Sequence, residues 1–178
     1  MTDATLRNLT PEVRTLAGDL RAGRISTQQW AAQMRAIVAD AHLLSAASAR
    51  GGWSPDRMTD EAYGQVGSVI RGQLAYLDGF VADIEGGLPL DGAFTRRAVM
   101  YVQRGTNTYE RARRAVETGR GMSEVRNLLD LTIPETNHCV GAGSCPAESA
   151  KGWTTPDQMS LPGDRICING CRCRLEWR

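Results

Sequence analysis

Residues 165–178 read RICINGCRCRLEWR, and this stretch decides how the end of the chain is interpreted. Two short runs flank Asn169 and Gly170, and Asn-Gly is the dipeptide that most favours the type I′ turn of a β-hairpin. The sequence therefore predicts a hairpin here. The same stretch carries three cysteines, Cys167, Cys171 and Cys173. A thiol cluster of this density is typical of a redox site, a disulfide framework or a metal site.

A second cysteine motif, HCVGAGSC, lies upstream at residues 138–145. Zinc is usually held in a tetrahedron by four Cys or His ligands that come from two close groups in the sequence. The two motifs together fit this arrangement, so the sequence predicts a structural zinc site. We expect four of the five cysteines to bind the metal, with Cys139, Cys145 and Cys167 favoured, Cys171 or Cys173 completing the set, and His138 as a substitute ligand.

The context argues against the other two chemistries. The N-terminal residues lack the basic-then-apolar pattern of a signal peptide, and no apolar run approaches the length of about 20 residues that a membrane helix needs. We therefore expect synthesis in a cytoplasm, where thiols stay reduced and disulfides are disfavoured. The odd number of cysteines argues the same way. A nucleophilic cysteine with His138 as its base stays an alternative, but the sequence shows no complete catalytic arrangement and no Cys-x-x-Cys pair.

The remainder of the chain has the patterns of α-helices. Helix starts are predicted at Thr10 before Pro11, at Ser26 with Gln29 in capping-box spacing, at Thr59, at Asp91, and at Ser123 for a short helix through Leu129. Composition shifts toward Gly, Pro, Ser and Cys after residue 134. The sequence thus predicts a mainly α protein, with a helical bundle-like body at residues 1–134 and a small zinc-ribbon-like module containing the hairpin at residues 135–178.

Arginines recur along the helix that is expected to start at Asp91. Arg97, Arg104 and Arg111 fall seven residues apart, and they are candidates for phosphate or partner contacts. The net charge of the whole chain is only +1, so bulk electrostatics do not require a nucleic acid or a membrane surface. A solvated flank with ordinary salt bridges is the simpler interpretation of these arginines.

Several motifs together resemble a known family. The segment RRAVMYVQRGTNTYERARR at residues 96–114 is followed by NHC at 137–139, KGW at 151–153, LPG at 161–163 and the terminal CRCRLEWR. This order is similar to that of the minor head, or head-morphogenesis, proteins of tailed bacteriophages, the Mu-like F group. The resemblance covers about the last half of the chain best, from Thr95 onward.

The resemblance implies structural work and no enzymatic activity. Proteins of that family associate with the portal, a connector or the inner capsid wall, and they assist head assembly and DNA packaging or delivery. We therefore expect a virion protein, made in the bacterial host cytoplasm, that is oligomeric in the particle and contacts portal, major capsid or connector proteins, and packaged DNA without sequence preference. The alternative is a cytoplasmic zinc-containing module that binds nucleic acid through the arginine-rich helix.

Overall fold

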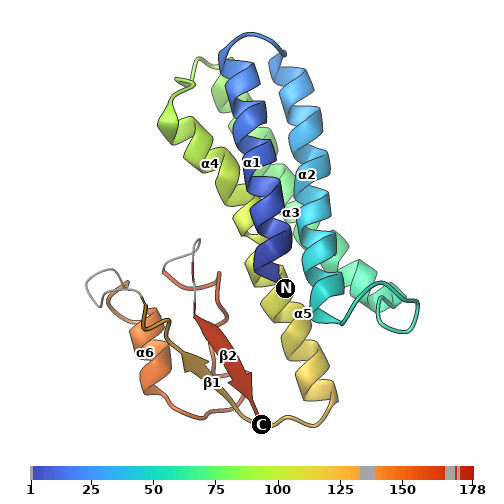
Figure 1. Ribbon diagram of the computed structural model, residues 1–178, viewed down its shortest axis with the longest axis vertical. Coiled ribbons are helices and arrows are strands. Elements are labelled where there is room, and N and C mark those ends of the chain that lie inside the picture. The colour runs from blue at the N-terminus through green and yellow to red at the C-terminus, as the bar shows by residue number, and fades with distance from the viewer. Residues whose placement is uncertain (1, 133–138, 167–170, 172) are drawn as a thin grey trace. The chain divides into compact units, whose positions relative to one another are not determined.

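The computed structural model describes residues 2–132, 139–166, 171 and 173–178, with side chains from residue 9 onward. The chain is mainly helical and carries one small antiparallel sheet near its C-terminus, which confirms the predicted fold class (Figure 1). It divides into two compact units, residues 1–109 and 110–178. Within the described residues, no helix has both the length and the apolar character that crossing a membrane requires.

This division lies earlier than the boundary expected after residue 134. The reason is strand β1 (Val125–Leu128), which lies in a stretch that was assigned to the helical body. β1 pairs with strand β2 (Arg174–Trp177) near the end of the chain, so residues 125–128 belong to the same compact unit as the C-terminus.

The first unit contains four complete helices and the beginning of a fifth. They are α1 (Thr2–Arg21), α2 (Thr27–Ala49), α3 (Asp60–Glu85), α4 (Gly92–Gln103) and α5 (Gly105–Gly119), which continues into the second unit. Three predicted helix starts are confirmed. Ser26 forms a full capping box with Gln29, the Thr59 hydroxyl accepts from an amide of α3, and the Asp91 carboxylate accepts from two amides of α4.

Two helix boundaries differ from the expectation. Pro11 lies inside α1, so Thr10 does not start that helix. A proline removes only its own N–H bond, and the helix continues on both sides of it here. The long helix expected from Asp91 is in fact two, because Arg104 caps the end of α4 and Gly105 begins α5.

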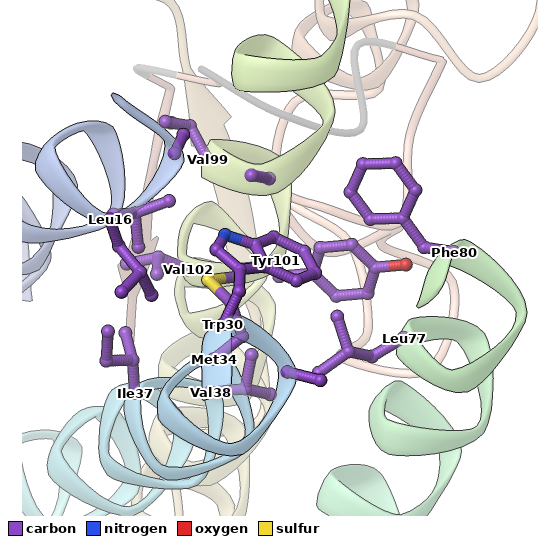
Figure 2. Packing of buried hydrophobic residues seen from close by; sticks show 14 of the residues in the cluster. Leu16, Trp30, Met34, Ile37, Val38, Leu77, Phe80, Val99, Tyr101 and Val102 are labelled. Atoms are coloured by element: carbon purple, nitrogen blue, oxygen red, sulfur yellow. The ribbon is translucent and has the colours of Figure 1, made fainter. Parts of the chain in front are cut away.

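An aromatic cluster lies at the centre of the first unit's core. Trp30 of α2 is fully buried and packs edge-on against Phe80 of α3, with 5.6 Å between ring centroids. Phe94 lies 5.5 Å from both rings, and Tyr101 stacks on Phe80 at 6.1 Å. Figure 2 shows these side chains surrounded by aliphatic residues of α1, α2, α3 and α4, all of which belong to one buried cluster. This core explains how the helices are stabilised without any metal.

The second unit is built on the two-stranded sheet. β1 and β2 are antiparallel, with Val125 opposite Trp177 and Leu128 opposite Arg174. The other edge of β1 carries a single bridge from Val125 to Thr154. Helix α6 (Cys145–Ala150) contacts β1 (Figure 1).

One secondary-structure prediction for this unit needs correction. Residues 125–128 form a strand, not the short helix expected from Ser123, because Val125 and Asn127 are buried in strand alternation against the rest of the unit. Among the described residues, β2 pairs with β1, and Arg165 and Ile166 lie outside any strand. The Asn169–Gly170 turn lies outside the described residues.

The apolar core of the second unit is small. Among its described residues, one cluster joins Val125, Met159, Leu161 and Leu175, with Trp177 packed at its edge. A compact unit with so few buried apolar side chains usually needs a disulfide or a metal to remain folded.

Candidate metal centre

Three cysteine thiols meet at one end of the second unit. The Sγ atoms of Cys145, Cys171 and Cys173 all lie within 4.8 Å of one another. Cys145 is the first residue of α6, whereas Cys171 and Cys173 come just before β2. Both predicted motifs therefore contribute to one cluster, as the sequence indicated.

The sulfur spacing is suitable for a tetrahedral metal ion. A Zn–S bond of about 2.3 Å places two sulfurs of a tetrahedral site about 3.8 Å apart. The Sγ atoms of Cys145 and Cys171 are 3.6 Å apart. This distance is far longer than the S–S bond of about 2.05 Å in a disulfide, and all four cysteines among the described residues are free thiols. The cluster can hold a thiophilic cation without rearrangement of the backbone.

Among the described residues, one further candidate, Cys139, lies next to the three thiols without belonging to their group. The Sγ of Cys139 accepts a hydrogen bond from the backbone amide of Cys145 at 3.3 Å, so this thiol lies beside the cluster. Amide-to-sulfur bonds of this kind stabilise thiolate charge in a metal site. His138 and Cys167 lie outside the described residues, so their predicted roles stay predictions.

Local hydrogen bonds fix the position of Cys145. The Ser144 hydroxyl caps α6 by accepting from the amide of Ala147 at 3.2 Å, and Pro146 lies in the first turn, where its missing N–H costs no helix bond. The Nδ2 group of Asn127 donates to the Cys145 carbonyl at 3.1 Å. Since Asn127 belongs to β1, this bond connects the sheet to the start of the helix.

A buried arginine lies directly behind the cluster. Only 3% of Arg165 is exposed, and its Nη1 group lies 2.8 Å from Oδ1 of Asn127 and 3.7 Å from Sγ of Cys145. Nε and Nη2 both donate to the carbonyl of Ser160, at 3.0 and 2.5 Å. The guanidinium thus brings a fixed positive charge to a group of sulfurs that become anionic when they bind a metal.

A buried carboxylate of α6 connects this helix to the same region. Glu148 is 3% exposed, and it accepts from the amide of Ser160 and from Nζ of Lys151, both at 2.9 Å. These hydrogen bonds outweigh the effect of burial, so the pKa of Glu148 lies below its usual value. Glu148 therefore connects α6 to Ser160, the residue whose carbonyl accepts from Arg165.

Burial and mutual contact raise the pKa values of two thiols of the cluster, Cys145 and Cys173. Burial raises the pKa of the Cys145 thiol, although the hydrogen bond from Arg165 opposes this change. The pKa of Cys173 is raised strongly by its hydrogen bond with Cys171 and then by burial. A metal must displace these protons, so binding would release protons and would weaken as the pH falls.

The three candidate arginines are divided between the two units. Arg97 and Arg104 line a pocket of about 230 Å³ in the first unit, together with Gln73, Tyr76, Met100 and Tyr101. Arg97 forms an ion pair with Asp83 at 2.7 Å. Arg111 belongs to the second unit and forms an ion pair with Asp164 at 2.8 Å. A phosphate would compete with these carboxylates for Arg97 and Arg111.

Sequence reasoning missed the residues that support the cluster. Asn127 was assigned to a helix, and Arg165 was treated only as the first residue of a hairpin strand. One signal in the sequence could have indicated that Arg165 lies near the thiols, namely its position two residues before Cys167. Its burial depends on contacts with Asn127 and Ser160 that the order of residues does not reveal.

Comparisons with known proteins do not add to these observations. No protein-family model, no curated protein and no solved structure matches this chain.

Proposed function

We propose that residues 110–178 form a structural unit stabilised by one zinc ion, and that the chain serves as a structural component of a tailed-phage head. The observation that carries the metal site is the meeting of three thiols within 4.8 Å in a unit whose own apolar core is small. Zinc is the metal of choice because thiolate ligands in a tetrahedron suit it and because it undergoes no redox change of its own.

The set of ligands follows from the geometry and the two motifs. Cys145, Cys171 and Cys173 supply three thiolates. Cys139 is the described candidate for the fourth position, since its sulfur already accepts the Cys145 amide. Cys167 and His138 are the candidates outside the described residues. A closed set of four protein ligands leaves no open position for substrate, which makes the role structural.

The properties of the cysteines favour structure over catalysis. A nucleophilic cysteine needs a lowered pKa, usually from a neighbouring cation or helix end. Here the pKa values of Cys145 and Cys173 are raised. This direction argues against Cys145 and Cys173 as catalytic nucleophiles, so we infer a structural role for the cluster.

The virion role rests on the family resemblance alone. The supporting motifs are RRAVMYVQRGTNTYERARR, NHC and the terminal CRCRLEWR. In this role the helical unit and the zinc unit would bind portal, connector or capsid proteins in an oligomeric assembly. Mass-spectrometric detection of the chain in purified phage particles, with a portal or terminase gene beside its own gene, would support the role. Its absence from purified particles would contradict it.

The zinc unit can be tested separately by hydrogen exchange on the full chain. We expect a chelator to increase amide exchange in β1, α6 and β2, while α1 to α4 stay protected. The reason is that the first unit has its own aromatic core, whereas the second depends on the metal. Unchanged protection of the second unit after removal of all bound metal would contradict the structural role of zinc.

A further inference from the structure

Two thiols of the cluster come from different motifs and lie in contact with each other. Cys145 and Cys171 are in direct sulfur-to-sulfur contact at 3.6 Å, although they lie on separate segments of the chain. Cys171 is half-buried and Cys145 is buried. Cys171 is therefore the less buried residue of the pair.

We propose that Cys145 and Cys171 form a reversible dithiol–disulfide pair, and that its oxidation by a peroxide releases the metal from the cluster. The release depends on the zinc site proposed above, whereas the choice of this pair depends only on the sulfur geometry. The two sulfurs must approach by about 1.5 Å to reach the bond length of a disulfide.

The chemistry balances with hydrogen peroxide as the oxidant. The Cys171 thiolate attacks one peroxide oxygen, so that an S–O bond forms, the O–O bond breaks, and hydroxide leaves and takes up a proton. The Cys145 thiolate then attacks the sulfenic sulfur of Cys171, which forms the S–S bond and expels a second hydroxide, also protonated to water. Two electrons pass from the two sulfurs to one peroxide, two protons are consumed, and the zinc ion loses two of its ligands.

The surroundings of Cys145 suit the resolving thiol. Arg165 Nη1 lies 3.7 Å from its sulfur, and the Asn127 side chain holds its carbonyl. Cys145 is thus kept facing Cys171 while the oxidant reacts at the more accessible sulfur. Reduction by a thiol or a phosphine would restore both ligands, so the metal would be retained only in a reducing compartment.

The test uses the full-length, zinc-loaded chain treated with hydrogen peroxide. Zinc release is followed with a chromophoric chelator, and the disulfide is mapped by mass spectrometry without reduction. We expect one zinc released for each disulfide formed, a crosslink that joins Cys145 to Cys171, and recovery of zinc binding after reduction. Cys145→Ser and Cys171→Ser should each lose this crosslink, because each lacks one sulfur of the pair.

Controls separate this inference from the zinc proposal. The Cys139→Ser variant keeps both sulfurs of the pair and should still form the crosslink. A chain that forms the Cys145–Cys171 disulfide but never binds zinc would contradict the zinc proposal and not the pairing. A zinc-loaded chain that keeps its metal in peroxide, or that joins other cysteines instead, would overturn the inference.

Discussion

Replacement of Arg165 by glutamine tests whether the residues behind the cluster contribute to metal binding. Arg165 is only 3% exposed. Its guanidinium donates to Asn127 and Ser160, and it points toward the Cys145 sulfur. Glutamine removes the positive charge and most of these donors. Loss of the outer partners of a metal ligand typically lowers metal affinity by about 10- to 100-fold, which corresponds to about 1.4–2.8 kcal/mol.

The stability of the second unit should fall in the same variant. Oδ1 of Asn127 lies in a residue that is only 2% exposed, so it would lose its donor without gaining full access to water. An unsatisfied buried acceptor costs about 1–3 kcal/mol. The stability of the second unit in Arg165→Lys should lie between that of Arg165→Gln and that of the wild type. Lysine keeps the positive charge but lacks the planar set of donors of the guanidinium.

The assay is zinc competition against a chelator of known affinity at pH 7, on the full chain. Cobalt substitution provides a second readout, since the thiolate-to-cobalt charge-transfer bands should shift when the Arg165 contact with Cys145 is lost. Arg120→Gln is the matched control, because Arg120 carries the same charge on the surface of the same unit with its side chain 65% exposed. Wild-type zinc affinity and unchanged cobalt bands in Arg165→Gln would refute the reasoning and leave Arg165 as a core residue only.

Two further predictions concern the first unit. Trp30→Ala should lower its free energy of unfolding by about 3–5 kcal/mol in a denaturant titration, because Trp30 is fully buried among aromatic rings. Trp53 is 53% exposed, so Trp53→Ala should change the free energy of unfolding little. Equal losses in Trp30→Ala and Trp53→Ala would contradict the core described here. His42 is 1% exposed, bonds to Thr108 at 2.6 Å, and has a pKa lowered to about 4 by burial and then by the charge of Arg104. At His42 the folded state therefore binds fewer protons than the unfolded chain between about pH 6.5 and 4, so the contribution of His42 should lower the stability of the first unit by about 2 kcal/mol from pH 7 to pH 5. His42→Gln should remove most of this loss, and an identical pH dependence in the variant would show that another group is responsible.

Local signals in the sequence predicted the helices well. The caps at Ser26, Thr59 and Asp91 depend on side chains that bond to amides two or three residues away, so the sequence contains the whole interaction. The break at Arg104 was not predicted, because apolar residues recur at helical spacing on both sides of the polar run at residues 103–108 and favoured one continuous helix.

The second unit was predicted in composition but not in topology. Ligand spacing predicted that thiols of the two motifs would meet, since a metal site needs two close groups of thiols. It favoured only one of Cys171 and Cys173 as a ligand, whereas both lie beside Cys145. The pairing of β1 with β2 joins residues far apart in the chain, and the order of residues gives no direct signal for such contacts. The positions of Asn127 and Arg165 depend on that pairing, so they could not be predicted from the sequence.

The metal content of the full chain tests the central claim most directly. Protein purified without a chelator should contain one zinc ion per chain by elemental analysis. X-ray absorption at the zinc edge should then show thiolate sulfurs at about 2.3 Å in a four-coordinate site. Protein that is folded, as judged by protected amides in β1 and β2, and that contains no zinc would contradict the account.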